Sequence, residues 1–262
     1  MIDISIIIPV YNSSNILPEL IKRINNSLSK ISSFEIILIN DFSSDKSWDV
    51  IKKLQKDYLN LRGINLKQNY GQHNALMAGL NNVKGNFIIM MDDDLQHPPE
   101  KIIDIYNELN KGFDICYVKY VNRKHVKWKI FVSWLNNIIS SILIQKSINV
   151  YTSSFKGINL ALKDKIIKYK KPQVFIDWLI LNETKNISTI NVEHYKRHSG
   201  NTNYSFKKLL LLWSNMVLII PVLPIRFSSI FLFCAKIIVK IFVYRLVKEK
   251  DFKEQYEVIE KI

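Results

Sequence analysis

Hydrophobic and polar positions follow two different periods over the first 120 residues. Four short segments that contain isoleucine, leucine or methionine predict strands, and the first two are typical of strands buried on both faces. These segments cover residues 4–10, 35–39, 61–66 and 87–91. Apolar residues spaced three and four positions apart predict helices over 15–30, 47–58, 72–83 and about 98–110. Strands that alternate with helices indicate an α/β fold with a mostly parallel sheet flanked by helices.

The periodicity is less regular after residue 112. A basic and aromatic stretch covers residues 119–129, and an apolar helix is expected at 130–144. A further helix is expected at 174–181 and a strand at 187–192. We therefore expect one domain over residues 1–206, with halves at 1–112 and 113–206, then a hydrophobic or amphipathic helical appendage over 207–247 and a charged, helix-forming tail over 248–262.

The appendage contains two apolar stretches, but neither is an uninterrupted run of about 20 apolar residues. Pro221 and Pro224 separate the stretches, and Lys236 and Lys240 lie four residues apart within the second. This pattern is typical of an amphipathic helix in the membrane interface. A single imperfect transmembrane helix and a core helix of a soluble domain are the alternatives. The chain starts without a basic region or a small-residue cleavage site, so we expect no signal peptide.

The charge is distributed unevenly along the chain. Of 262 residues with a net charge of +14, the first 110 carry 11 basic and 13 acidic residues, and the rest carry 26 and 10. A basic second part predicts an anionic partner such as phosphate groups or an anionic membrane surface, unless the lysines are simply solvated. Since the basic residues precede a hydrophobic tract instead of alternating with aromatic ones, we expect no nucleic-acid partner. Two distant cysteines without metal-type spacing indicate a reduced protein.

Polar clusters follow three of the predicted strands. They are Tyr11-Asn12, Asn40-Asp41 and the segment 92–96. Because ligands of parallel α/β sheets bind beyond the carboxyl ends of the strands, we expect these clusters to form one site. The third cluster, Asp92-Asp93-Asp94-Leu95-Gln96, offers the hard oxygen ligands that Mg²⁺ or Mn²⁺ prefers. The alternative for an isolated acidic motif is a solvated loop.

Several segments, in order, resemble the inverting GT-A glycosyltransferases of family 2, and among them the polyprenyl-phosphate glycosyltransferases. The similar segments are Ser5 to Asn12, Asn69 to Leu80, Met91 to Glu100 and Arg197 to Tyr204. The resemblance implies a GT-A fold, with a nucleotide-sugar-binding half at 1–112 and an acceptor half at 113–206. It also implies a nucleotide-diphospho-sugar donor and a divalent cation.

The resemblance implies roles for individual residues of the donor site. Pro9, Tyr11 and Asp41 would hold the nucleotide base and ribose, with Asn12 beside them. Asp92, Asp94 and Gln96 would serve the metal and the diphosphate, with Asp94 as the most direct metal ligand and a catalytic residue. Asp93 stands where relatives have a small residue and is expected to be solvated. Phe42 stands where relatives usually have glycine or asparagine.

The acceptor is predicted from the basic residues of the second half and from one position where this chain differs from the family it resembles. Where relatives usually carry an aspartate, this chain has Thr152 to Lys156. A sugar hydroxyl needs a general base, whereas a lipid phosphate is already an anionic nucleophile and needs only positive charge to hold it. The candidates to bind this phosphate are Arg197, which is also the second predicted catalytic residue, and Arg123, Lys124 and Lys156.

Together these features predict inverting transfer of a sugar to polyprenyl phosphate at the cytoplasmic face of the cell membrane. The protein would be peripheral or single-span, with a homo-oligomer among the options. One alternative is transfer to a sugar hydroxyl of a lipid-linked or cell-surface glycan. Another is a non-catalytic module that binds nucleotides or membranes.

Overall fold

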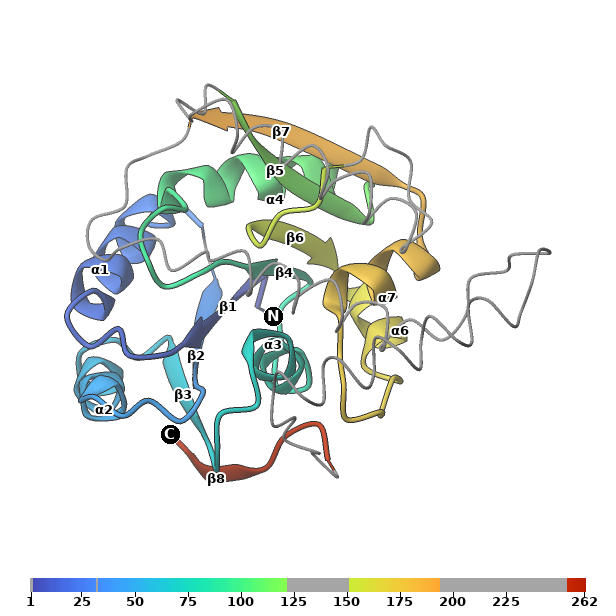
Figure 1. Cartoon of the computed structure of the whole chain (residues 1–262). Coiled ribbons are helices and arrows are strands. Elements are labelled where there is room, and N and C mark those ends of the chain that lie inside the picture. The colour runs from blue at the N-terminus through green and yellow to red at the C-terminus, as the bar shows by residue number, and fades with distance from the viewer. Residues whose placement is uncertain (1, 32, 122–150, 194–253) are drawn as a thin grey trace, which may run out of the picture. The chain divides into compact units, whose positions relative to one another are not determined.

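The computed structural model describes residues 2–31, 33–121, 151–193 and 254–262. These residues form one eight-stranded sheet in the order β7-β5-β6-β4-β1-β2-β3-β8, with helices on both faces (Figure 1). The strands are β1 Ile4–Val10, β2 Phe34–Asn40, β3 Leu61–Leu66, β4 Phe87–Met90, β5 Ile115–Val121, β6 Lys156–Asn159, β7 Ile187–Glu193 and β8 Val258–Lys261. The helices are α1 Leu17–Ser27, α2 Ser47–Asp57, α3 Gln72–Leu80, α4 Ile102–Asn110, α6 Leu160–Ile166 and α7 Ile176–Glu183, and a 3₁₀ turn, η1, covers Pro99–Lys101.

The centre of the sheet is parallel. β1 pairs in parallel with β2 on one side and β4 on the other, and β2 pairs in parallel with β3. Every residue of β1 is buried, which explains its unbroken apolar sequence. β6 and β8 run antiparallel to their neighbours, so the mostly parallel prediction holds for the first half of the chain and the whole sheet is mixed.

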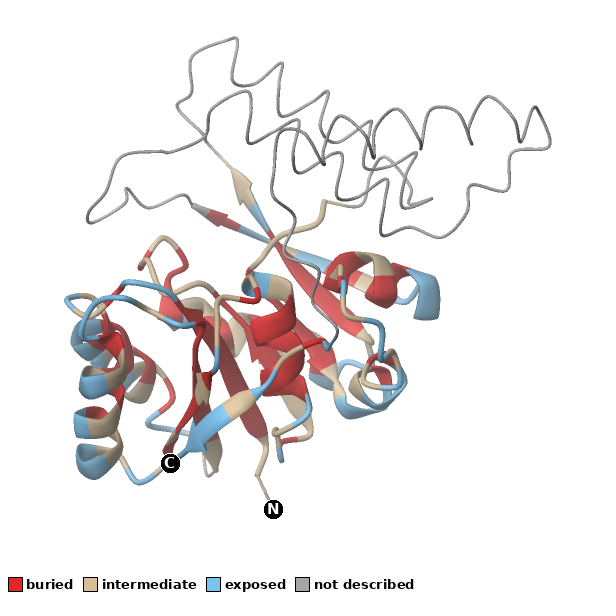
Figure 2. Ribbon diagram, turned by 60° about the horizontal axis from the view of Figure 1, so that its bottom comes forward, coloured by how far each residue is buried: buried red, intermediate tan, exposed pale blue. Residues whose placement is uncertain are grey.

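Alternate residues of the central strands pack against different helices. Ile6 and Ile8 of β1 share a buried cluster with α1, α2 and α4. Ile7 faces the other side, where it lies against Gly79 of α3. Figure 2 shows that buried positions are concentrated in the strands and on the helix faces turned toward them. The sheet is therefore covered on both faces, and the carboxyl edge of its parallel strands is the place for a site.

Most of the elements predicted before residue 112 are confirmed, as are the helix and strand expected near 174–181 and 187–192. β5, β6 and α6 were not predicted. The expectation of a helix-forming tail is wrong for residues 258–261, which form β8 along the exposed edge of β3. An edge strand offers unpaired backbone groups, and their hydrogen bonds, such as those between Gly63 and Ile262, outweigh the weak helix propensity of the tail.

The predicted helix at 130–144 and the appendage at 207–247 lie outside the described residues. Within the ranges that the structure does describe, no helix is both long and apolar enough to cross a membrane.

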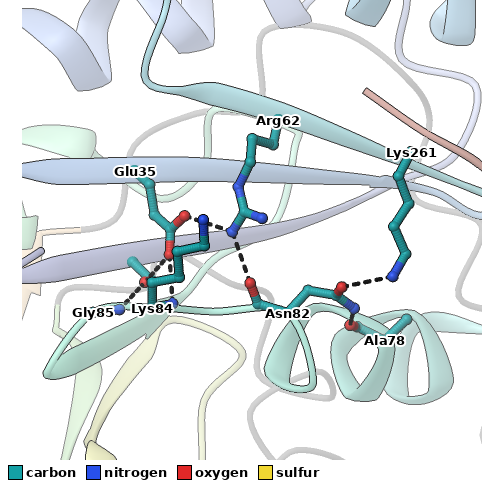
Figure 3. Close-up of polar contacts among 8 residues, drawn as sticks. Glu35, Arg62, Ala78, Asn82, Lys84, Gly85 and Lys261 are labelled. Atoms are coloured by element: carbon teal, nitrogen blue, oxygen red, sulfur yellow. Dashed lines mark hydrogen bonds and ion pairs between the residues drawn. The ribbon is translucent and has the colours of Figure 1, made fainter.

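A polar cluster ties the amino ends of the strands together (Figure 3). The buried Glu35 of β2 accepts hydrogen bonds from Ser5 Oγ (2.6 Å) and Lys84 N (2.6 Å), and pairs with Arg62 of β3 at 2.5 Å. Arg62 also donates to the carbonyl of Asn82, whose side chain accepts from Lys261 of β8. The cluster therefore links β1, β2 and β3 to the loop before β4, at the edge opposite the predicted site.

Candidate active site

The loops after β1, β2 and β4 meet at one edge of the sheet, as the sequence predicts. The amide of Asp41 donates to the carbonyl of Val10 (2.9 Å), which joins the ends of β1 and β2. The amide of Tyr11 donates to Oδ2 of Asp93 (3.2 Å), which joins β1 to the loop after β4. Residues more than 80 positions apart are thereby brought into one site.

All three non-glycine residues with positive φ in the described part of the chain lie in these loops. They are Asn12 (φ 56°), Phe42 (φ 58°) and Leu95 (φ 59°). Left-handed backbone is disfavoured for side chains other than asparagine and aspartate, and such strain is concentrated at functional sites. The backbone geometry thus marks the same edge as the polar sequence clusters.

Several predicted donor-binding residues are engaged in the loops themselves. Asn12 Oδ1 accepts a hydrogen bond from the amide of Ser44 at 2.8 Å. The buried Asp41 accepts from the amides of Tyr70 (2.7 Å) and Gly71 (2.9 Å), which fixes the entry to α3. Pro9 is buried within β1, whereas Tyr11 is 53% exposed at its end. Tyr11 and Asn12 are therefore the exposed members of this group, and Tyr11 offers a ring to a ligand.

The carboxylate of Asp92 is held from two sides. Gln72 Nε2, from the start of α3, donates to Oδ1 at 2.6 Å. Ser154 Oγ, from the segment before β6, donates to Oδ2 at 2.8 Å. Neither contact was predicted, because both join residues that are distant in sequence. They fix the orientation of a carboxylate that is still 29% exposed.

His97 supports the same carboxylate and has a defined tautomer. Its Nδ1 accepts a hydrogen bond from the amide of Asp92 (2.9 Å), so the neutral ring carries its proton on Nε2. That nitrogen lies 3.4 Å from Ser154 Oγ and 3.6 Å from Asp92 Oδ2. The ring stacks on Phe155 and Tyr120, with centroids 5.1 and 5.9 Å away. His97 therefore belongs to the scaffold that holds Asp92.

The expectation that the side chain of Asp93 is solvated is wrong. It is partly buried and accepts the Tyr11 amide described above. Burial raises the pKa of Asp93 to about 6, against the hydrogen bonds from Ser13 and Tyr11, and the charges of Asp92 and Asp94 raise it further. Three adjacent carboxyl groups, one of them partly buried, indicate a place where a cation is favoured.

Asp94 and Gln96 form a tight turn around Leu95. Asp94 Oδ1 accepts the amide of Gln96 at 3.0 Å, while the buried Leu95 anchors the turn in the core. No group of three or more histidine, cysteine, aspartate or glutamate side chains with metal-binding geometry occurs in the described ranges. Mg²⁺ and Mn²⁺ in transfer enzymes are often held by one or two carboxylates together with substrate phosphates. Asp92 and Asp94 fit that type of site.

The prediction that Lys156 binds the acceptor phosphate is wrong. Its ammonium group is buried at 1% exposure and paired with Asp177 of α7. Tyr117 also donates to Asp177 at 2.9 Å. An ammonium group that is enclosed in this way holds α7 against β5 and β6 and is not presented to a phosphate. Arg123, Lys124 and Arg197 lie outside the described residues.

His73 of α3 lies near these groups. Burial lowers the pKa of His73 to about 4, against the attraction of Asp177, so the ring is neutral at physiological pH. It contacts Phe175 edge to face, with ring centroids 4.9 Å apart. His73 therefore supplies no positive charge to the site.

A mixed sheet with an acidic turn after β4 and an exposed aromatic residue after β1 is consistent with the GT-A fold that the sequence predicts. Solved structures support this fold. Glucosyl-3-phosphoglycerate synthase from Mycobacterium tuberculosis, in complex with Mn²⁺, UDP and phosphoglyceric acid, is 13% identical with a TM-score of 0.61 over 82% of this chain and 77% of that one. TarS 1-349 from S. aureus, in complex with UDP-GlcNAc, is 23% identical with a TM-score of 0.52 over 85% and 68%.

The chain belongs to glycosyl transferase family 2, whose model matches residues 5–169. It is therefore a glycosyltransferase. Among curated relatives, the undecaprenyl-phosphate 4-deoxy-4-formamido-L-arabinose transferase of Salmonella choleraesuis (strain SC-B67) is 32% identical over 229 residues, which are 87% of this chain and 70% of the relative. The same enzyme of Salmonella typhimurium (strain LT2) matches with the same identity and coverage. The predicted resemblance to polyprenyl-phosphate glycosyltransferases is confirmed.

Proposed function

We propose that this glycosyltransferase moves a sugar, with inversion, from a nucleotide-diphospho-sugar to polyprenyl phosphate at the cytoplasmic face of a membrane. The observation that carries the proposal is the edge where Tyr11, Asp41 and the turn from Asp92 to Gln96 meet. An exposed aromatic ring and carboxylates with fixed orientation are what recognition of a base and of a metal-bound diphosphate requires.

In this proposal the donor lies across the carboxyl edge of the sheet. Tyr11 contacts the nucleotide base, while the buried Asp41 serves the base and ribose by holding the loop after β2 in place through the amides of Tyr70 and Gly71. Asp92 and Asp94 would hold a Mg²⁺ or Mn²⁺ ion, with Gln96 next to them. The ion, when bound, offsets the negative charge that develops on the departing diphosphate.

The surroundings of the site favour a phosphate acceptor over a hydroxyl acceptor. Ser154 points at Asp92 from the segment where a base was expected by resemblance, and a serine hydroxyl is no base near neutral pH. The nearby carboxylate of Asp177 is paired with Lys156 and bonded to Tyr117, so it is not available as a base. Asp93 accepts a hydrogen bond from the amide of Tyr11. An acceptor that is already anionic needs no base.

The topology of the sheet constrains how the chain reaches a membrane. β7 ends at Glu193 and β8 begins at Val258, and both belong to the same sheet. The intervening chain therefore leaves and returns on one side of any bilayer that it contacts. This argues against the predicted single crossing and is compatible both with an even number of crossings and with peripheral or interfacial attachment, the form suggested by the spacing of Lys236 and Lys240.

Two alternatives make different predictions. A family member that acts on a sugar hydroxyl would label a lipid-linked glycan and leave polyprenyl phosphate unlabelled. A non-catalytic nucleotide-binding module would bind a nucleotide sugar without ever releasing the nucleoside diphosphate.

The proposal is tested by a binding screen of nucleotide-diphospho-sugars against the purified full chain, with and without Mn²⁺ or Mg²⁺. We expect at least one donor to bind, and the cation to tighten that binding by about tenfold or more. Donor binding that no cation alters would refute the metal-assisted form of the proposal. Absence of binding by every donor would refute the donor assignment itself.

Ser154→Ala tests the support of Asp92. The variant removes the hydrogen bond to Asp92 Oδ2, and loss of a residue that orients a metal ligand typically weakens metal affinity by about 10- to 100-fold. Mn²⁺ binding, followed by electron paramagnetic resonance of the free ion, measures this loss, and Ser154→Thr should recover most of the affinity. Ser153→Ala is the matched control, because the hydroxyl of Ser153 accepts a hydrogen bond from the amide of Phe155, whereas it is the hydroxyl of Ser154 that donates to Asp92. Unchanged Mn²⁺ affinity in Ser154→Ala would contradict the assigned orientation.

A further inference from the structure

Phe42 adopts a strained backbone conformation that packing does not explain. Of the three non-glycine residues with positive φ in the described ranges, Asn12 belongs to a type that tolerates this conformation, and Leu95 is held by its burial in the core. Phe42 combines a φ of 58° with a ring that is 54% exposed. Neither residue type nor core packing compensates for its conformation, and an uncompensated outlier of this kind points to function.

The position of Phe42 relates it to Tyr11. The Asp41 amide bonds to the Val10 carbonyl at 2.9 Å, and the Asn12 amide bonds to Ser43 Oγ at 3.0 Å. These two bonds hold residues 10–12 beside residues 41–43, with Tyr11 and Phe42 at the middle of each segment. Five large apolar or aromatic side chains are exposed in the described part of the chain, and the two aromatic ones are Tyr11 and Phe42. Both therefore present their rings to solvent at the same edge.

We infer that Phe42 is a stacking surface for the nucleobase of the donor, acting together with Tyr11. The inference rests on the proposed function, because it requires a nucleotide at this edge. Aromatic rings bind bases through their faces, which gives affinity without selecting one base. The left-handed backbone turns the ring outward into solvent, and the bound base covers it. The glycine or asparagine expected here by resemblance would relieve the strain but would offer no ring.

The inference predicts opposite effects on stability and on binding. Phe42→Gly removes the strain, and the thermal unfolding midpoint is expected to rise by about 2–4 °C. The same change removes the ring, so affinity for a nucleoside diphosphate should fall about five- to tenfold. UDP, ADP, GDP, CDP and dTDP are first screened for binding to the wild-type protein in the presence of Mn²⁺. The affinity of wild type and variant for the nucleotide that binds most tightly is then measured by titration calorimetry. Pyrophosphate with Mn²⁺, which has no base, should bind wild type and variant equally.

Matched variants separate the ring from the backbone. Phe42→Leu keeps a β-carbon and loses the ring, so it should lose nucleotide affinity without a rise in the unfolding midpoint. Phe42→Tyr should keep wild-type affinity. Leu59→Ala is the control for an exposed apolar side chain away from this edge, since Leu59 is 96% exposed in the turn before β3, and it should change neither property.

Three results would overturn the inference, and they are distinguishable. If wild type binds a nucleoside diphosphate and Phe42→Gly binds it equally well, the ring does not contact the base and the donor site itself stands. If Phe42→Gly weakens pyrophosphate as much as the nucleotide, the residue shapes the loop and does not stack on the base. If wild type binds none of the five probes, the proposed function fails, and the inference fails with it.

Discussion

Asp94→Asn is expected to lower sugar transfer by about 100- to 1,000-fold while the protein stays folded. Asparagine keeps an oxygen at the position of Asp94 Oδ1, so the turn that accepts the Gln96 amide is preserved. What is lost is one negative charge at the proposed cation, and with it the stabilisation of the departing diphosphate. The measurement is initial velocity at saturating donor, with circular dichroism and the unfolding midpoint as evidence that the fold is intact.

Asp93→Asn is the matched control for this prediction. It removes a charge from the adjacent position, where the side chain bonds to Tyr11 and burial already raises the pKa of the carboxyl to about 6. We expect it to retain activity within about tenfold of wild type, because the asparagine oxygen still accepts the Tyr11 amide. If Asp93→Asn loses as much activity as Asp94→Asn, the assignment of the metal ligand to Asp94 is wrong.

Glu35→Gln is expected to lower the free energy of unfolding by about 3 kcal/mol. The buried carboxylate accepts hydrogen bonds from Ser5 and Lys84 and pairs with Arg62, and the variant leaves that guanidinium, whose side chain is 33% exposed, without its charge partner (Figure 3). A loss of this size is a large part of the 5–15 kcal/mol typical of a whole protein. Urea unfolding followed by far-UV circular dichroism measures it.

A second ion pair provides the contrast. Glu100 pairs with Arg23 at 2.8 Å but is 53% exposed, so Glu100→Gln should change the free energy of unfolding by less than about 1 kcal/mol. Adding Arg62→Met to the Glu35→Gln variant should recover part of the lost stability, because it removes the unpaired charge. Equal losses for Glu35→Gln and Glu100→Gln would show that the buried cluster does not stabilise the fold as described.

The first half of the fold follows from the sequence because its signals are local. The segments at 4–10 and 35–39 are apolar except for Ser5 and Glu35 at their amino ends, and such strands are typical of the centre of a covered parallel sheet. Once the sheet is parallel, the ends of β1, β2 and β4 must share an edge. The meeting of Tyr11, Asp41 and Asp92 is therefore predictable without knowledge of any single contact.

The missed features depend on contacts between distant residues. β6 is four residues long and contains Lys156, whose burial makes sense only beside Asp177 of α7. β8 has no strand periodicity of its own and is fixed by the exposed edge of β3. The hydrogen bond from Ser154 to Asp92 joins residues that are 62 positions apart. No local pattern specifies such pairings, although a lysine in a short apolar segment is a signal that a partner is required.

The central claim is that polyprenyl phosphate accepts a sugar from a nucleotide-diphospho-sugar bound at the edge around Asp92 to Gln96. The most direct test incubates the purified full chain with a panel of nucleotide sugars, Mg²⁺ or Mn²⁺ and undecaprenyl phosphate, and measures lipid products and released nucleoside diphosphate by mass spectrometry. The account predicts one sugar-phosphate-lipid formed per nucleoside diphosphate released. Undecaprenyl phosphate that stays unmodified with every donor would contradict it.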